Sequence, residues 1–371
     1  MLRCGRSIAL AHAVTIAVVV VLPAGAARSS EPSIGLRPDN AGPEYARAAA
    51  EAGADGVHLQ LYWSQSEPHP GQFDWSQFEA GVAHFQAVGL PIGSVRVVAA
   101  PDWAVAGGAC GPKFCPPTRE HYEAFRDFTT TTVARYGPGT PTNVPRFILW
   151  NEPDLPGKWG GKSYEDGSYR RYSDLLGAFY RGAIEANPDV SVDAGEVMAG
   201  GSVEPRTWVK GFTRYNTKRN RNDHYEVLRI HGYSRDGEEL AEKIRDHQRL
   251  SGVTRLGVSE FAWAVGDPGH EVPSGGFKCA RSAEEQAEKL RSAVRAVRRH
   301  TAGVDWLVWL AAVDKLQEDK NRRCVDGSDY YDESVRDQVN PWGLFRRAPD
   351  GSFDPLDPRP IVDVFRRQAA R

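Results

Sequence analysis

The sequence has almost no excess of charge of either sign. Its 46 Lys and Arg residues nearly balance its 48 Asp and Glu residues, which leaves a formal net charge of -2 over 371 residues. Proteins that bind nucleic acids or anionic membranes usually carry a basic excess. The composition therefore gives no argument for a nucleic-acid or membrane-surface partner, and a neutral polymer or small sugar is the expected kind of ligand.

The chain also has little long apolar sequence, apart from Ile8 to Leu22 near the N-terminus. Arg3 and Arg6 precede this run and Ala24-Gly25-Ala26 follows it, which is the order of parts in a secretory signal peptide. A membrane anchor is the alternative, but the run is short for a bilayer span, and small and polar residues follow it. We expect residues 1–26 to be removed, and residues 27–371 to be secreted without a membrane attachment.

Cysteine is scarce, with five in the chain, and Cys4 would leave with the signal peptide. The remaining four, an even number in an exported protein, favour disulfides over metal ligation. We predict that Cys110 pairs with Cys115 and that Cys279 pairs with Cys324. Free thiols or other pairings stay open, because spacing does not fix connectivity.

A repeated alternation of short apolar strands with amphipathic helices fills most of the chain. Residues 57–63 alternate strictly between apolar and polar, as a strand does, whereas Phe78, Val82 and Phe85 form the buried stripe of a helix that ends at Gly89. The connections are too long for hairpins, so the sheet should be parallel with right-handed crossovers. We predict strands at 33–37, 57–63, 92–99, 146–151, 190–194, 227–231, 255–260 and 306–310.

Eight strand–helix units in one chain predict a single-domain (β/α)8 barrel. An open doubly wound sheet is the alternative, but the first predicted strand is not followed by the Gly-x-Gly-x-x-Gly turn of that fold. No linker, low-complexity tract or appended binding module is visible.

Two of the predicted strands end in a glutamate. The apolar run at 147–150 stops at Asn151-Glu152-Pro153, and a second run that starts at Leu256 closes on Glu260. In a (β/α)8 barrel the carboxyl ends of the strands converge on one face, where active sites lie. A pair of carboxyl groups there is what cleavage of a glycosidic bond requires.

Other polar and aromatic residues fall at the same kind of position. His231 ends the sixth predicted strand and Tyr233 follows it, so both should lie near Glu260 and supply hydrogen bonds to it. Trp309 lies on the eighth strand, where an indole face could stack on a sugar ring. Trp306 is the alternative inward-facing residue of that strand.

The strand-four motif Asn151-Glu152-Pro153, together with Glu260 on strand seven, resembles the pattern of the clan A retaining glycoside hydrolases, such as the cellulase-like family 5 and the xylosidase-like family 39. The resemblance extends over essentially the whole mature chain. Residues 63–68 and 71–75 are similar to the W-x-x-x-E-P and G-x-F-D-W stretches that follow strand two in several of these families. The segment Trp342-Gly343-Leu344-Phe345 also looks like their C-terminal part.

The resemblance implies a role for each matching residue. Glu152 would be the general acid/base, Glu260 the nucleophile and Asn151 a partner of the sugar 2-hydroxyl. It also implies a retaining mechanism on a β-linked glycoside, with no cofactor and no metal. Two carboxyl groups about 5–5.5 Å apart would suit that mechanism, whereas inverting enzymes separate them by about 6.5–9.5 Å.

The chain departs from the clan pattern on the second strand. Many members carry an arginine near the nucleophile there, and the matching position in this sequence is His58. A histidine could still bond to the nucleophile, but its charge would depend on pH. An ordinary barrel-interior histidine is the alternative.

Trp63, Trp103, Trp159 and Trp263 lie in loops or at strand ends and are candidates for further sugar subsites, or for packing at the rim. The long loops 154–169 and 311–342 are expected to set specificity, while the sugar, the linkage and endo or exo action stay open. We expect a monomer.

Two other functions compete with hydrolysis. A metal-dependent hydrolase would need a His-x-His on an early strand, and the first predicted strand, residues 34–37, has none. A secreted barrel that binds carbohydrate without turning it over would be expected to lack one of the glutamates, and both are present.

Overall fold

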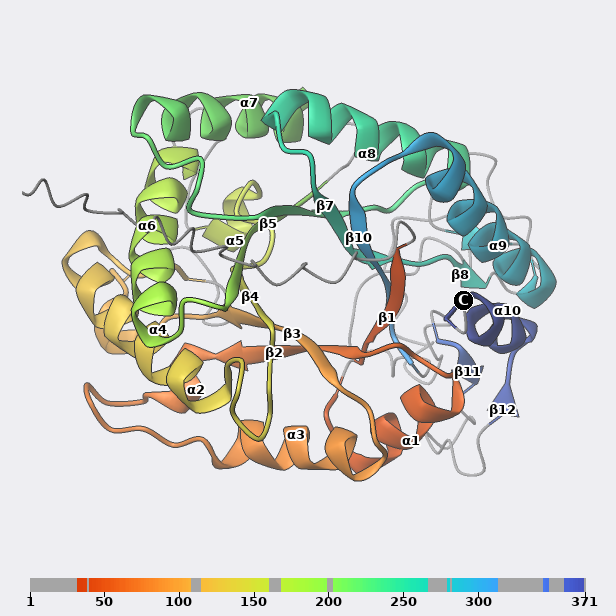
Figure 1. Cartoon of the computed structure of the whole chain (residues 1–371), viewed down its shortest axis with the longest axis horizontal. Coiled ribbons are helices and arrows are strands. Elements are labelled where there is room, and N and C mark those ends of the chain that lie inside the picture. Colours follow the sequence, from red (N-terminus) through yellow and green to blue (C-terminus); the bar gives the residue numbers. More distant parts are fainter. Residues whose placement is uncertain are drawn as a thin grey trace, which may run out of the picture. The chain divides into compact units, whose positions relative to one another are not determined.

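The computed structural model shows a closed barrel of eight parallel strands in the order β1-β10-β7-β6-β5-β4-β3-β2. Helices surround it (Figure 1). The prediction of a (β/α)8 barrel is confirmed. The structure describes residues 32–38, 40–107, 115–159, 168–198, 203–265, 279–280, 282–312, 343–346 and 357–369.

The barrel strands are short and, apart from a few polar positions, buried. Each pairs in parallel with both neighbours, and β1 closes the barrel by aligning Ser33 with Trp306 and Arg37 with Leu310 of β10. Burial on both faces explains why these segments are nearly continuous apolar runs. The strands are β1 (Ser33–Arg37), β2 (Val57–Tyr62), β3 (Ile92–Val98), β4 (Arg146–Leu149), β5 (Ser191–Met198), β6 (Val227–His231), β7 (Leu256–Phe261) and β10 (Val304–Leu310).

The helices connect successive strands and bury one apolar face each. In α9, for example, Ala287, Leu290, Val294 and Val297 are buried and recur at helical spacing. The longer helices are α1 (Pro43–Glu51), α3 (Ser76–Ala87), α4 (Tyr122–Tyr136), α6 (Ser168–Ala186), α7 (Val203–Lys218), α8 (Gly237–Ser251), α9 (Ala283–His300) and α10 (Pro360–Ala369).

Short elements decorate the loops. They are α2 (Trp63–Ser66), α5 (Pro156–Trp159), the 3-10 turns Asp102–Ala104 and Arg119–His121, and the paired short strands β8 (Ala264–Val265) with β9 (Cys279–Ala280) and β11 (Phe345–Arg346) with β12 (Asp357–Pro358).

One strand differs from its predicted length in a way that matters. β5 continues to Met198, four residues past the predicted end at Ala194, and its register shifts between Gly195 and Val197. Gly195 has φ 100°, which an L side chain rarely adopts, and a Cβ there would meet the carbonyl oxygen of Arg229 at 2.4 Å. This bulge carries Glu196 to the carboxyl end of the barrel.

Other sequence predictions fall partly outside the described residues. Cys115 is disulfide-bonded, but its expected partner Cys110 lies outside them, as does Cys324, so both pairings stay predictions. The same holds for the segment expected to be a signal peptide. Within the described part of the chain, none of the helices has the length and apolarity needed to cross a bilayer.

Candidate active site

Charged and polar side chains from six strands meet at the carboxyl end of the barrel. The expected members are Asn151 and Glu152 after β4, His231 and Tyr233 from the end of β6, and Glu260 on β7. Three others join them that the sequence did not single out, namely Arg37 at the end of β1, Arg96 on β3 and Glu196 on β5.

Glu152 stands on an unusual backbone. Its φ is 48° and that of Trp150 is 67°, both in the left-handed region that non-glycine residues seldom occupy. The backbone N–H of Glu152 donates to the carbonyl of Glu196 at 3.0 Å, which ties the end of β4 to β5. Its carboxylate contacts His231 Nδ1 at 3.0 Å and accepts from Asn151 Nδ2 at 3.3 Å. Backbone strain of this kind is concentrated at functional sites.

Glu260 is held by hydrogen-bond donors on both carboxylate oxygens. Arg37 donates to Oε1 at 2.5 Å and Tyr233 donates to Oε2 at 3.0 Å, while Arg96 lies 3.4 Å from Oε1. Burial alone would raise the pKa of Glu260, but the charges of His231, Arg37 and Arg96 outweigh it and lower the pKa to about 2. Glu260 is therefore a carboxylate at neutral pH, as a nucleophile must be.

Glu196 lies beneath these two glutamates and is completely buried. Its Oε2 accepts a hydrogen bond from Arg96 and lies 3.5 Å from Arg37 and 3.7 Å from His231 Nε2. Burial opposes its charge, but the two guanidinium groups hold the pKa of Glu196 well below its usual range. It is the internal counter-ion that keeps both arginines in place.

His231 lies among the three glutamates. Burial would lower its pKa, but the negative charge of Glu260 and the contacts with Glu152 and Glu196 raise the pKa to about 10. The ring is therefore an imidazolium at neutral pH, so both nitrogens are donors.

The two candidate catalytic carboxylates are close together. His231 Nδ1 is 3.0 Å from Glu152 Oε1 and 3.4 Å from Glu260 Oε2. Those two oxygens are therefore at most about 6.4 Å apart, the sum of 3.0 and 3.4 Å. For this pair of oxygens the upper limit lies just below about 6.5 Å, the lower end of the carboxyl separations in inverting glycosidases.

Asp154, two residues after Glu152, is a buried acid outside this network. Both of its carboxylate oxygens accept from the backbone N–H of Met198, at 3.2 and 3.1 Å. Burial raises its pKa to about 7. It joins the loop after β4 to the end of β5, next to the link that Glu152 makes with Glu196.

Glu196, His231 and Glu260 also place ligand atoms within 4.8 Å of one another, which is a spacing that a metal ion could use. One oxygen of each carboxylate is already engaged, because Arg96 binds Glu196 Oε2 and Arg37 binds Glu260 Oε1. A divalent ion that used those two oxygens would have to displace a guanidinium group from each of them. The donor set therefore suits an ionic network better than a metal centre.

His58 does not take the place of the expected arginine. Its Nδ1 bonds to Ser94 at 2.6 Å, and its ring packs edge-on against Trp306 at 4.8 Å inside the barrel. Burial and nearby Arg229 and Arg37 lower its pKa well below the usual value, so it is neutral. The cations on Glu260 come from β1 and β3 instead, and His58 is a barrel-interior histidine, which was the alternative interpretation.

Most of the tryptophans expected to bind sugar pack inside the protein instead. Trp63, Trp263 and Trp309 are fully buried in this structure, so none of them offers a face to a sugar. Trp63 packs on Phe125 and Phe128, and Trp309 packs on Phe261 and Trp263.

The remaining tryptophans lie in different settings. Trp159 is also fully buried, edge-on against Trp150. Trp103 lies beside Trp63 and is partly exposed. Of the four tryptophans expected in loops or at strand ends, it is the one that keeps accessible surface. Trp306, the alternative to Trp309, faces His58 near the beginning of β10.

Comparison with protein-family models and with curated proteins gives no match. Solved structures do match at the level of the fold. They include a family 39 glycoside hydrolase from the gut symbiont Bacteroides cellulosilyticus WH2, with 18% identity and a TM-score of 0.59, over 92% of this chain and 64% of that one. The chain thus spans less than two thirds of that enzyme.

Two further structures cover similar parts of this chain. A glucosidase from Croceicoccus marinus has 15% identity and a TM-score of 0.60, over 92% of this chain and 68% of that one. Xylanase XynB from Paenibacillus barcinonensis has 15% identity and a TM-score of 0.60, over 91% and 95%. The chain therefore shares the (β/α)8 barrel fold of these glycoside hydrolases, as its eight strand–helix units predicted.

Proposed function

We propose that the protein is a secreted, retaining glycoside hydrolase that cleaves β-linked glycosides of an oligo- or polysaccharide. The observation that carries the proposal is the pairing of Glu152 and Glu260 across His231, with facing oxygens at most about 6.4 Å apart. Fold likeness to glycoside hydrolases supports it, although fold alone does not define an activity.

In the first step Glu260 attacks the anomeric carbon and forms a covalent glycosyl–enzyme, while Glu152 gives its proton to the departing glycosidic oxygen. Arg37 and Tyr233 hold the attacking carboxylate at its two oxygens, so that its lone pair is fixed in direction. In the second step Glu152 takes a proton from water, whose oxygen displaces Glu260 from the sugar. Two inversions give net retention.

Asn151 has the right position to bind substrate. Its Oδ1 accepts from Arg96 and its Nδ2 points to Glu152, so the amide is fixed between the two catalytic strands. A hydrogen bond from this amide to the sugar 2-hydroxyl would strengthen as the transition state forms.

The test is direct assay of the mature protein on aryl β-glycosides and on a panel of plant, fungal and bacterial polysaccharides. Proton NMR of the first-formed product reads the anomeric configuration, and mass spectrometry identifies the released sugars. Retention supports the proposal, and an inverted product contradicts it. Sugar binding without any turnover would instead favour the carbohydrate-binding barrel.

Glu67→Gln provides a matched control for the loss of a buried glutamate. Glu67 is 5% exposed, and its carboxylate accepts from Trp63 Nε1 and from the N–H of Gly71, both at 2.7 Å. We expect Glu152→Gln and Glu260→Gln to abolish hydrolysis, whereas Glu67→Gln lowers stability and leaves kcat near that of the parent.

Secretion and a monomeric state belong to the same proposal. Mass determination of the protein recovered from the culture medium would show whether residues 1–26 are absent. Light scattering of the purified protein would give its mass in solution.

A further inference from the structure

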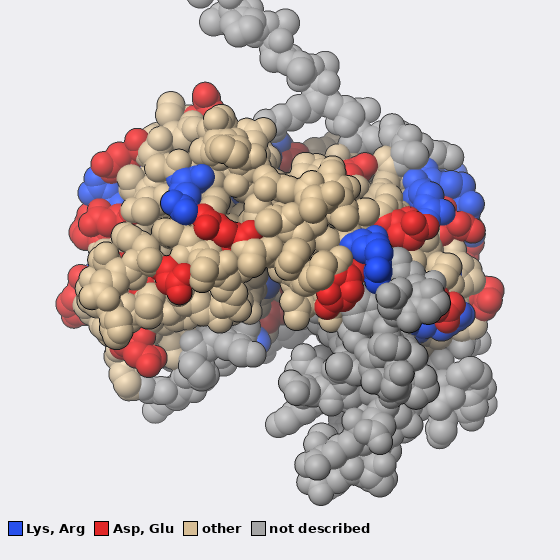
Figure 2. All heavy atoms as spheres, turned by 90° about the horizontal axis from the view of Figure 1, so that it is seen from below, with Lys and Arg blue, Asp and Glu red and all other residues tan. Residues whose placement is uncertain are grey.

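A cavity of about 400 Å³ lies between α9 and α10, on the outside of the barrel. It is lined by Arg291, Arg295, Arg298, Arg299 and Arg367, with Gln368 as the sixth residue. None of the described residues that line it is acidic. Such a cavity departs from the rest of the described surface seen in Figure 2, where acidic and basic side chains are interspersed.

Three of these arginines lack a carboxylate partner among the described residues. Arg295, Arg299 and Arg367 are exposed and form no ion pair there, whereas Arg291 pairs with Glu288. Most other surface arginines in the described part of the chain are paired, as Arg126 is with Glu123 and Glu185 and Arg366 is with Glu51. The concentration of unpaired cations in one cavity is therefore unusual for this protein.

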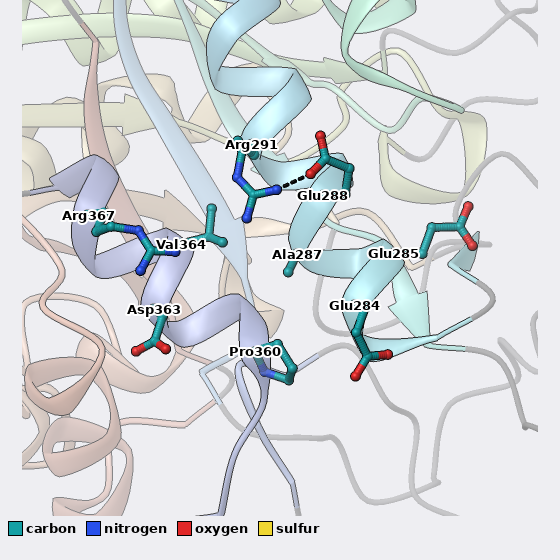
Figure 3. A pocket seen from close by; sticks show the side chains of 9 residues that line it. All are labelled: Glu284, Glu285, Ala287, Glu288, Arg291, Pro360, Asp363, Val364 and Arg367. Atoms are coloured by element: carbon teal, nitrogen blue, oxygen red, sulfur yellow. Dashed lines mark hydrogen bonds and ion pairs between the residues drawn. The ribbon is translucent and has the colours of Figure 1, made fainter.

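The arginines are regularly spaced. Arg291, Arg295 and Arg299 follow one another at four-residue intervals, so they lie on one face of α9 over about 12 Å. Arg367 comes from the last turn of α10. In the adjoining cavity, drawn in Figure 3, the side chains of Arg291 and Arg367 extend from the two helices into the space between them.

Helix dipoles explain only part of the cluster. Cations in the last turn of a helix are stabilising, which accounts for Arg299 in α9 and Arg367 in α10. Arg295 lies inside α9 and has no such reason. Like charges four residues apart also destabilise a helix, so an unpaired row of arginines is unfavourable unless an anion neutralises it.

The cavity is far from the proposed active site. α9 ends at His300, four residues before β10 begins at Val304, so Arg298 and Arg299 lie near the amino ends of the strands. Arg366, the neighbour of Arg367, donates to the carbonyl of Glu51, which ends the helix before β2. Glu152 and Glu260 lie at the carboxyl ends, on the opposite side of the barrel.

We propose that this arginine groove is a second binding site, which takes an anionic polysaccharide through its regularly spaced carboxylate or sulfate groups. The guanidinium fork matches both groups with paired hydrogen bonds. A row of cations along one helix matches a polymer whose anionic groups are regularly spaced. The choice of a polysaccharide as the ligand rests on the proposed function, whereas the anion site itself rests on the groove.

The experiment compares two triple variants. Arg295→Ala/Arg299→Ala/Arg367→Ala removes the three unpaired arginines of the groove. The control, Lys210→Ala/Arg214→Ala/Lys218→Ala, removes three exposed cations at the same four-residue spacing on α7, and none of the three lines the arginine groove or the cavity beside it. Both triples change the net charge equally.

Binding is measured by affinity electrophoresis and titration calorimetry with polygalacturonate, dextran sulfate and neutral dextran, at low and at physiological salt. We expect the parent and the control triple to bind one or both anionic polymers, with affinity that falls as salt rises, and not to bind dextran. The groove triple should bind at least about tenfold more weakly, the loss expected for three charge-assisted contacts. The two polymers distinguish a carboxylate ligand from a sulfate ligand.

Three results would overturn the proposal: no binding of either anionic polymer by the parent, equal weakening in both triples, or tighter binding of a DNA duplex of matched charge. Hydrolysis of an aryl glycoside is measured in parallel and should be equal in all three proteins. Failure of that hydrolysis would count against the proposed function, whereas intact hydrolysis by a parent protein that binds neither anionic polymer would count against the groove alone.

Discussion

Two buried ionic clusters lie inside the barrel, one at each end of the strands. The cluster at the carboxyl end contains Glu152, Glu196, Glu260 and their cations. The cluster nearer the amino end joins Asp193 to Arg146 and Arg229, both at 2.6 Å. Both contain short, nearly desolvated ion pairs, so ion pairing does not by itself identify an active site.

The two clusters differ in exposure and in the balance of charge. The side chains of Glu152 and Glu260 are 14% and 12% exposed, whereas those of Asp193 and Arg229 are 0% exposed. At the carboxyl end three glutamates are matched by three cations, His231 and two arginines. At the amino end two aspartates, Asp193 and Asp305, serve three arginines. Accessible acids and a strained backbone at Glu152 distinguish the end proposed to be reactive, and complete burial of Asp193 and Arg229 distinguishes the other end.

The largest expected effect is on activity, from Glu260→Gln. Because the amide cannot form the covalent intermediate, kcat/KM should fall by at least about 10³-fold. The amide keeps the size of the carboxylate, so the near-UV circular dichroism spectrum should be that of the parent. Initial rates on an activated aryl glycoside measure the loss. Activity within tenfold of the parent would reject Glu260 as the nucleophile.

Asp193→Asn should have its largest effect on stability instead. The change leaves Arg229 buried without a counter-ion, whereas Arg146 keeps Asp305 at 3.3 Å. Loss of one partner of a buried ion pair typically costs about 3–5 kcal/mol of unfolding free energy. Denaturant unfolding measures the loss, and activity per folded molecule should stay near the parent value. A variant with the stability of the parent but no activity would show that the amino-end cluster takes part in function. The two clusters would then no longer differ in role.

Much of the carboxyl-end cluster could be predicted from the sequence, because Glu152, His231 and Glu260 each stand at the end of a short, mostly apolar strand. Glu196 could not be predicted in this way, because the sequence pattern of the fifth strand ends at Ala194. Only the bulge at Gly195 directs Glu196 into the site. A carboxylate directly after a glycine in a buried strand was the available signal.

Arg37 and Arg96 were visible in the sequence as lone arginines in apolar strands. The family pattern did not indicate these two arginines, because it places an arginine on the second strand, where this chain has His58. Which strand supplies the cation depends on how the barrel closes, and residue type alone does not show it.

The tryptophans show a second limit of the sequence. Trp63 and Trp263 stand next to strand ends, as a sugar-binding residue would, but their environment depends on the helices packed over them. Large aromatic side chains contribute most to burial, so packing is a common outcome even beside an active site.

Tyr233→Phe should have an intermediate effect on the reactive end. It removes one hydrogen bond to the Glu260 carboxylate, leaving Arg37 as the donor at 2.5 Å. A hydrogen bond to a charged group is worth about 1.5–3 kcal/mol, so kcat should fall by roughly 10- to 100-fold. Tyr225→Phe, at another largely buried tyrosine on the strand-six side of the barrel, is the control and should leave kcat unchanged.

The last comparison concerns the dependence of stability on pH. The pKa of Glu260 is lowered from 4.5 to about 2, so its stabilising contribution is present above pH 4.5 and lost as the pH falls toward 2. The pKa of His231 is raised from 6.5 to about 10, so its contribution is full below pH 6.5 and lost as the pH rises toward 10. The pKa of Asp154 is raised from 3.8 to about 7, so its stabilising contribution is lost as the pH rises through that interval.

These three groups predict a stability maximum on the acid side of neutrality. Melting temperatures from pH 3 to pH 10 test it through two variants. His231→Gln should flatten the decline between pH 6.5 and 10, whereas Asp154→Asn should flatten the decline between pH 3.8 and 7. The amino-end Asp193→Asn variant should be displaced to lower stability while keeping the shape of the parent curve. If only Asp193→Asn changed the shape of the curve of melting temperature against pH, the groups that titrate would belong to the amino-end cluster. That result would contradict the assignment of the titrating groups to the carboxyl end.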